Sequence, residues 1–167
     1  SSPHTCAVLD DGSVKCWGYN NFGQLGIGNT TTMGGAADKI GDNLAAVDLG
    51  TGRTAVDVSV GDRFSCALLD NGDVKCWGRN NNGQLGIGNT TTMGNAADEM
   101  GDNLAAVDLG TGRTAVAIAA GYDHVCAILD NGQVKCWGAN GHGRLGIENT
   151  TYICLLYTSP SPRDVST

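Results

Sequence analysis

Short apolar runs that alternate with polar residues recur along the chain and predict β-strands. Residues 55–60, Ala-Val-Asp-Val-Ser-Val, alternate with a period of two, which is the side-chain period of a strand. A second apolar run covers residues 64–69, and a third covers residues 73–77. Between them, Asp70-Asn71-Gly72 has the composition of a three-residue hairpin turn, because glycine readily takes the left-handed conformation that such a turn needs.

Further segments complete this unit. Residues 104–109 can supply a fourth strand, and residues 96–100 are expected to form one helical turn. Residues 79–88 are rich in Asn and Gly and predict a loop. Helical periodicity is otherwise absent from the sequence. The predicted fold class is therefore all-β, with four short antiparallel strands in each unit, which is the blade of a β-propeller.

The whole pattern repeats every 60 residues. The motif Cys-Ala-x-Leu-Asp-x-Gly-x-Val-Lys-Cys-Trp-Gly begins at Cys6, Cys66 and Cys126. Similarity at a fixed period indicates a repeat architecture, in which each unit buries its apolar face against its neighbours. The expected organisation is a repeat region over 1–151, divided into a partial unit 1–60, a complete unit 61–120 and a partial unit 121–151, followed by a non-homologous tail over 152–167.

Two cysteines flank the predicted hairpin turn in every unit. If residues 10–12 form the turn, Val8 faces Val14, and Cys6 faces Cys16 at a non-hydrogen-bonded site. Cα atoms at such a site lie about 4.5 Å apart, which is close enough for a disulfide. One cross-strand disulfide is therefore predicted in each unit: Cys6–Cys16, Cys66–Cys76 and Cys126–Cys136.

Two other states of these cysteines are open. They could be pairs of buried free thiols in a cytosolic protein, or they could bind zinc. The zinc interpretation is disfavoured because the sequence has no Cys-x-x-Cys pair and no recurring histidine to complete a ligand set. Disulfides require an oxidising compartment, so the predicted localisation is extracellular or cell-surface, with any signal peptide outside this chain.

Charge and composition exclude several classes of function. A net charge of −7 argues against nucleic-acid binding, which needs a basic face to displace counterions. No apolar run approaches the roughly 18 residues that a membrane span requires. The three histidines, His4, His124 and His142, are not accompanied by a matching pattern of serines or acids. The aspartates near glycine, such as Asp102 and Asp108, lack the spacing of a calcium loop. No catalytic residue, cofactor or metal is therefore expected.

The third copy of the repeat resembles a known family. Residues 121–146 read Gly-Tyr-Asp-His-Val-Cys-Ala-Ile-Leu-Asp-Asn-Gly-Gln-Val-Lys-Cys-Trp-Gly-Ala-Asn-Gly-His-Gly-Arg-Leu-Gly. This order of residues is similar to the repeat of the regulator-of-chromosome-condensation family. Residues 61–88 fit it with Phe64 in place of the histidine, and residues 4–28 fit it with His4. The resemblance implies a partial β-propeller of two and a half to three blades, from a seven-bladed ring whose loops bind other proteins.

The family includes a nucleotide-exchange factor for a small GTPase and also secreted bacterial proteins. The paired cysteines and the long segment over 101–115 favour the bacterial secreted or cell-surface branch. The matched residues build blades and carry over no exchange site. Three interpretations follow: a non-catalytic protein-binding segment of a secreted or cell-surface propeller, a structural repeat array without a dedicated partner, and an intracellular regulator of the guanine-nucleotide-exchange type.

Recurring aromatic residues are interpreted as packing residues. Trp77 and its equivalents in the other two units occupy one fixed strand position, as packing between blades requires. Phe64 stands where the other units have His4 and His124, so this position needs a ring of similar size.

The positions at which the units differ are the candidate partner contacts. They lie in the loop after the Trp-Gly pair, where Tyr19 aligns with Arg79 and Ala139, and Phe22 aligns with Asn82 and His142. A partner can read such differences, although random change on a solvated loop explains them equally well. The predicted partners are an unidentified protein and the missing blades of the same chain. The candidate contacts are Tyr19, Phe22, Arg79, Asn82 and His142.

The repeat similarity stops at Tyr152. Residues 152–167 lack glycine and strand alternation, so the segment is predicted to be artefactual or disordered, with Cys154 as the odd cysteine. The chain is expected to be a fragment, because seven units of this length would need roughly 420 residues. Such a fragment exposes blade faces and a strand edge, and is expected to be poorly soluble.

Overall fold

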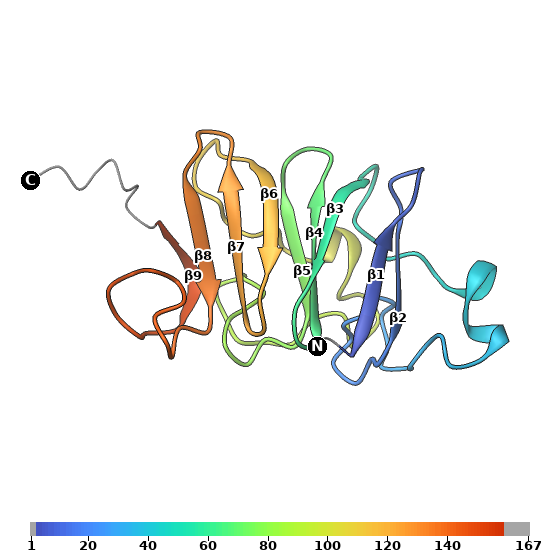
Figure 1. Cartoon of the computed structure of the whole chain (residues 1–167). Helices are drawn as coiled ribbons and strands as arrows, with labels where there is room; N and C mark the ends of the chain where they lie inside the picture. Colours follow the sequence, from blue (N-terminus) through green and yellow to red (C-terminus); the bar gives the residue numbers. More distant parts are fainter. Residues whose placement is uncertain (1–2, 159–167) are drawn as a thin grey trace, which may run out of the picture.

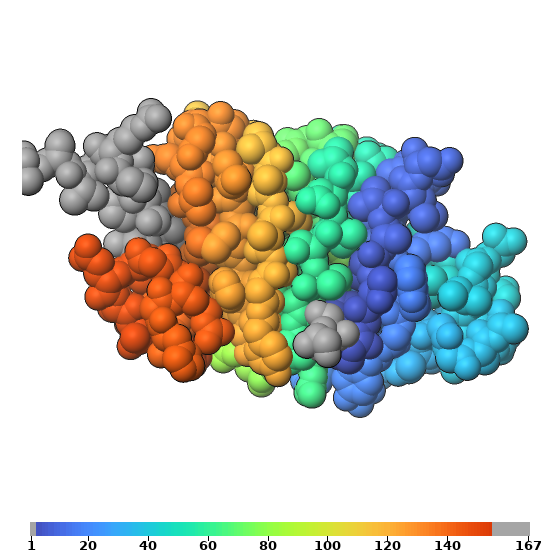
Figure 2. Space-filling view, viewed as in Figure 1, coloured from blue at the N-terminus to red at the C-terminus, as the bar shows by residue number. Residues whose placement is uncertain are grey.

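Three antiparallel β-sheets stack side by side in chain order along the long axis of the molecule (Figures 1 and 2). This computed structural model describes residues 3–158. We call the sheets and the loops that follow them unit 1 (3–54), unit 2 (55–114) and unit 3 (115–158). The strands are β1 (His4–Val8) and β2 (Val14–Gly18) in unit 1; β3 (Ala55–Val60), β4 (Phe64–Leu69) and β5 (Val74–Gly78) in unit 2; and β6 (Ala115–Ala120), β7 (His124–Leu129), β8 (Val134–Gly138) and β9 (Ile153–Thr158) in unit 3.

The hairpin register is the one that the sequence predicts. Val8 lies opposite Val14, and Cys6 lies opposite Cys16. The β4–β5 and β7–β8 hairpins repeat this register in units 2 and 3. The turn glycine of the complete unit, Gly72, has a φ of 82°, and its amide donates to the carbonyl of Leu69. Three strands of the complete unit are therefore confirmed.

The fourth strand expected over 104–109 is wrong. The chain there is extended but outside any sheet, and one of its amides, that of Val107, donates to the carbonyl of Val74 in β5. The other end of β5 pairs through an isolated bridge between Gly78 and Met93. The outer edge of β5 is thus contacted at its two ends by two separate segments.

The segment between these two contacts packs back onto the preceding unit. It contains a short 3-10 helix, η3 (Gly101–Asn103); in unit 1 the same region forms η1 (Ala37–Lys39) and η2 (Gly41–Asn43). The helical turn expected over 96–100 is a single turn at residues 97–98. The carboxylate of Asp102 accepts hydrogen bonds from the amide and hydroxyl of Thr51 at 2.9 and 2.6 Å. The buried Lys75 ammonium donates to carbonyls of both units, at Leu49 and Gly101.

Apolar side chains fill the spaces between sheets. One cluster joins units 1 and 2, and includes Leu25 and Val14 from unit 1 with Leu69 and Trp77 from unit 2. A second cluster joins units 2 and 3 at the corresponding positions. β3, the first strand of unit 2, contacts β1 of unit 1 and β6 of unit 3. This is the face-to-face stacking of neighbouring propeller blades.

The outer faces of the stack are less covered than the inner ones. The side chain of Leu9 in unit 1 is 40% exposed, whereas its equivalent in unit 2, Leu69, is 1% exposed. Ile128 in unit 3 is 45% exposed, whereas its equivalent Leu68 is 4% exposed. In unit 2, both positions are covered by a neighbouring unit and are buried.

Strand β9 lies beside β8 and begins at the position that a methionine holds in the other units. Ile153 pairs with Gly138, as Met33 and Met93 bridge to Gly18 and Gly78. The prediction that 152–167 is not native protein concerns the origin of the segment, and it stays a prediction. Its part over 159–167 lies outside the described residues.

Within residues 3–158, no helix combines the length and the apolar character that crossing a bilayer requires.

Candidate functional site

The lower rim is the end of the stack where the β3–β4 and β6–β7 turns meet the loops that follow β2, β5 and β8 (Figure 1). The hairpin turns over 9–13, 70–73 and 130–133 form the opposite, upper rim. All five candidate contacts follow a Trp-Gly pair and therefore lie on the lower rim. The candidate site is built from this rim.

The rim loops are fixed by an asparagine that is buried in every unit. In unit 2, the side chain of Asn80 donates to the carbonyls of Asn89 and Thr91, and accepts from the amide of Leu85. Asn20 makes the same three bonds in unit 1. The loop is therefore held at both ends, and the side chains on its tip are presented from a common framework.

At the junction of units 1 and 2, an arginine stacks on two aromatic rings. The guanidinium carbon of Arg63 lies 5.8 Å from the ring centroid of Tyr19 and 5.5 Å from that of Phe22. Cation–π contacts at this distance favour a fixed guanidinium position. The Nε edge of Arg63 faces the buried carboxylate of Asp62 at 3.7 Å. The structure thus brings the two aromatic candidates together around a residue that sequence reasoning missed.

At the junction of units 2 and 3, an ion pair takes the same place. Nη1 of Arg79 lies 3.5 Å from Asp62 and 3.7 Å from Asp123. Burial raises the pKa of Asp123, while Arg79 and a hydrogen bond from the Asn82 side chain oppose that rise. Gln84 also donates to this carboxylate at 3.2 Å. Arg79 and Asn82 thus meet around Asp123, as Tyr19 and Phe22 meet around Arg63.

The fifth candidate lies on the outer side of unit 3. His142 is exposed, and its Nδ1 lies 3.0 Å from Nη2 of Arg144. The neighbouring candidate position, Ala139, is buried. The two residues missed by sequence reasoning, Arg63 and Asp123, align with each other and differ between units. Comparing the β3–β4 turn with its equivalents in the other units, and selecting the positions that differ, would have found them.

A buried histidine and serine lie behind the rim. Nε2 of His4 is 2.8 Å from Oγ of Ser65, and that hydroxyl donates to the carbonyl of Gln24 at 2.8 Å. Because the single hydroxyl hydrogen points to Gln24, Nε2 of His4 carries the proton and donates to Ser65. The histidine therefore cannot accept the serine proton as a general base does. Burial lowers the pKa of His4 to about 4, although the Asp62 carboxylate acts in the opposite direction.

The paired cysteines lie on the face of each sheet that points toward the next unit along the chain, which for the third pair is the outer face of unit 3. The structure joins Cys6 to Cys16, Cys66 to Cys76 and Cys126 to Cys136, with Cα atoms 4.1, 4.0 and 4.1 Å apart. The second pair is fully buried in the cluster between units 2 and 3. Cys154 is the free cysteine of the described residues.

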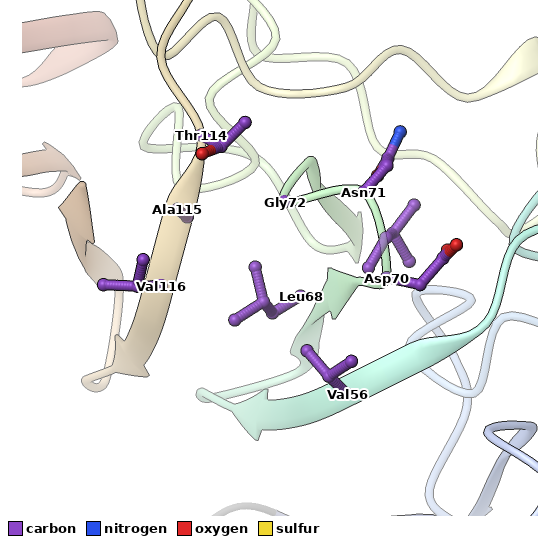
Figure 3. A pocket seen from close by; sticks show the side chains of 9 residues that line it. Val56, Leu68, Asp70, Asn71, Gly72, Thr114, Ala115 and Val116 are labelled. Atoms are coloured by element: carbon purple, nitrogen blue, oxygen red, sulfur yellow. The ribbon is translucent and has the colours of Figure 1, made fainter. Parts of the chain in front are cut away.

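The upper rim has an open groove of about 420 Å³ between units 2 and 3 (Figure 3). Val56 and Val116 lie on its two sides, each at the bulge of its strand. Its acidic residue, Asp70, is already bound by the Thr54 amide and by Arg53 of unit 1. Asp70 is therefore not free to bind a ligand in the groove, and we attribute the groove to the stacking of the sheets. Among residues 3–158, no cluster of three or more His, Cys, Asp or Glu side chains is placed to hold a metal ion.

The stacked sheets, the buried tryptophans and the repeated rim loops define a segment of a β-propeller. The model of the regulator of chromosome condensation (RCC1) repeat matches residues 4–24, 55–84 and 115–144. The chain belongs to this RCC1-like repeat family.

Relatives of the chain are much longer proteins. The ultraviolet-B receptor UVR8 of Arabidopsis thaliana is 30% identical over 151 residues, which cover 89% of this chain and 30% of UVR8. The human E3 ubiquitin-protein ligase HERC2 is 32% identical over 147 residues, which cover 88% of this chain and 3% of HERC2. The chain thus spans less than a third of either relative.

The solved structure of Prp20p from Saccharomyces cerevisiae superposes with a TM-score of 0.71 at 20% identity, covering 98% of this chain and 38% of Prp20p. That structure was described together with the binding of Prp20p to Gsp1p and histones, and another shows Kap60 bound to Prp20. At this identity, the likeness establishes the fold of the chain and not its partners.

Proposed function

We propose that this chain is a non-catalytic, protein-binding segment of a secreted or cell-surface β-propeller, and that its partner contacts the lower rim. The observation that carries the proposal is the contrast between interior and rim. Interior residues such as Trp77 and Asn80 are identical in all three units, whereas the rim positions around Arg63 and Asp123 change in size, charge and aromaticity. A purely structural array needs the first feature and gains nothing from the second.

An oxidising compartment is supported by the placement of the cysteines. Each disulfide lies on a blade face and closes a loop with a sequence separation of 10. Through loop-closure entropy, each disulfide stabilises the folded state by about 2–3 kcal/mol. An intracellular regulator would be expected to keep these six cysteines as thiols. Alkylation of the protein from its source, before any reduction, distinguishes the two locations.

Further repeats of the same protein are proposed as the neighbours of the exposed faces. Ile128 and Leu9 are exposed here, while their equivalents in unit 2, Leu68 and Leu69, are buried by the next and the preceding unit. The ion pairs between units support the same conclusion. Arg53 of unit 1 binds Asp70 of unit 2, and Arg113 of unit 2 binds Asp130 of unit 3. Asp10 occupies the corresponding position in unit 1 and fits an arginine from a preceding repeat.

Site-specific photo-cross-linking tests the binding rim. A photoreactive residue is placed at Asn82 or His142 on the lower rim, or at Asn71 or Asn131 on the upper rim as the matched control, and the protein is expressed in its source organism. Discrete protein adducts from the lower-rim positions alone are expected. Equal adducts from both rims, or none from either, would contradict a dedicated binding rim.

A further inference from the structure

Each junction between neighbouring units carries the same three-residue arrangement on the lower rim. Two residues come from the loop of the earlier unit, and the third comes from the β3–β4 or β6–β7 turn of the later unit. Tyr19 and Phe22 surround Arg63 at the first junction. Arg79 and Asn82 surround Asp123 at the second. We call these arrangements the first and second junction sets.

The two sets differ in whether their charge is satisfied within the protein. In the second set, Asp123 has an ion pair with Arg79 and a hydrogen bond from Gln84. In the first set, the guanidinium carbon lies over the rings of Tyr19 and Phe22, 5.8 and 5.5 Å from their centroids, and Asp62 faces its Nε edge at 3.7 Å. The buried Nε of Arg63 has no hydrogen-bond partner, no hydrogen bond from its terminal nitrogens is found within residues 3–158, and the side chain is 42% exposed.

The backbone at Arg63 is a second, independent observation. Its φ is 62°, in the left-handed region that favours glycine, and this conformation costs a non-glycine residue about 1 kcal/mol. The aligned residue of unit 3, Asp123, does not share this positive φ. Arginine has no backbone advantage at such a position, so its presence is accounted for by what the side chain does there.

We propose that the first junction set binds an anionic side chain of the protein partner, with the outer edge of Arg63 as the receptor. This inference rests on the proposed function of the lower rim. The outer edge of a guanidinium presents two parallel N–H donors, which match the two oxygens of a carboxylate or of a phosphate group. Tyr19 and Phe22 fix the fork before binding, so less side-chain entropy is lost when the anion arrives.

The chemistry favours one acidic residue within a partly apolar protein segment. The rings of Tyr19 and Phe22 offer apolar surface beside the charge. The whole chain has a net charge of −7, which repels a polyanion such as a nucleic acid but affects a single acidic residue much less. In the second junction set the third residue is itself an acid, Asp123, which pairs with Arg79, so this set is not expected to bind such a ligand.

Equilibrium binding of short peptides tests the inference. The chain is immobilised at low density, which keeps copies apart, and is exposed to ten-residue peptides that differ only in a central Glu, phosphoserine or Gln. The Glu and phosphoserine peptides are expected to bind more tightly than the Gln peptide. Arg63→Gln should weaken their binding about tenfold, as loss of a charge-assisted bidentate contact does.

Charge-matched variants serve as controls. Arg113→Gln removes the same charge from the upper rim, where Arg113 pairs with Asp130, and should change the binding by less than about twofold, a difference of under roughly 0.4 kcal/mol. Arg63→Lys keeps the charge without the planar fork and should bind at an intermediate level. Tryptophan fluorescence and disulfide content establish that each variant is folded. Preference for phosphoserine over Glu would identify a phosphorylated partner, and equal binding a carboxylate.

Three results would overturn the inference. Equal losses in Arg63→Gln and Arg113→Gln would show that binding follows net charge alone. Equal binding of the Glu and Gln peptides would show that the negative charge of the peptide is not recognised. Tighter, Arg63-dependent binding of a ten-nucleotide single strand would assign the set to nucleic acid. If lower-rim cross-links are found together with the first or second result, the binding rim stands and only the role of Arg63 fails.

Discussion

Replacing the buried pair of His4 and Ser65 by an apolar pair is expected to remove a pH dependence from the stability of this protein. The folded-state pKa of His4 is about 4, against an ordinary value of 6.5. Between these values the unfolded chain takes up a proton that the folded chain does not, so stability falls as the pH drops below 6.5. Between about pH 8 and pH 5, this one group lowers the free energy of unfolding by about 2 kcal/mol.

The second junction shows which apolar residues can replace this pair. At the next junction the equivalent positions hold Phe64 and Val125, both fully buried. The variant His4→Phe with Ser65→Val therefore converts the first junction to the composition of the second. The Gln24 carbonyl also accepts a hydrogen bond from the indole nitrogen of Trp77 at 3.0 Å, as the equivalent Gln84 carbonyl does from Trp137 in the second junction. This carbonyl therefore keeps a donor in the variant.

Urea unfolding followed by tryptophan fluorescence measures the effect. For a slope of about 2 kcal/mol per molar urea, the wild-type midpoint should fall by about 1 M more than that of the double variant between the two pH values. Ser65→Val alone leaves Nε2 of His4 without an acceptor and should cost about 1–3 kcal/mol at pH 8. If wild type and double variant lose the same stability on acidification, the assignment of the pH dependence to His4 is refuted.

Three further predictions concern packing, redox state and the exposed face of unit 3. Gly26→Ala should destabilise the protein by about 1 kcal/mol more than Gly52→Ala in urea unfolding, because both glycines have a positive φ but only the added Cβ at Gly26 meets the ring of Trp77, at 2.7 Å. Mass spectrometry after alkylation without reduction should find Cys154 labelled and the other six cysteines unlabelled; full labelling would argue for buried thiols. Ile128→Ser should raise the concentration at which the chain aggregates in size-exclusion chromatography, at little cost in stability. Leu68→Ser at the equivalent covered position should cost about 2–4 kcal/mol.

The hairpins could be predicted from the sequence because a hairpin is local. The three-residue turn fixes which residues face each other, so the pairing of Cys66 with Cys76 follows from counting outward from Gly72. The expectation over 104–109 failed although a signal against it was present. The buried residues there are Leu104, Val107 and Leu109, and the two exposed alanines between the first two break the alternation of a strand.

The candidate site was predicted only in part, because its members come from different units. Tyr19 and Arg63 meet through the stacking of one unit on the next, and no spacing within a single repeat records that meeting. Comparing the copies identified the variable positions in the loop after the Trp-Gly pair. It could not show that the β3–β4 turn of the following unit places its third residue between them, since this depends on the angle between the sheets.

The shared junctions determine how such proteins change when repeats are gained or lost. Because each junction set draws its third residue from the later unit, recombination between copies reassorts the sets without any point mutation. Loss of unit 2 would place Tyr19 and Phe22 around Asp123, replacing an anion receptor by an acidic group beside two rings. Duplication of unit 2 would place a second Arg63 beside Arg79 and Asn82, and replace the acidic third residue of the second set by a basic one. Unequal crossing-over between near-identical repeats can therefore produce new binding rims on an unchanged framework.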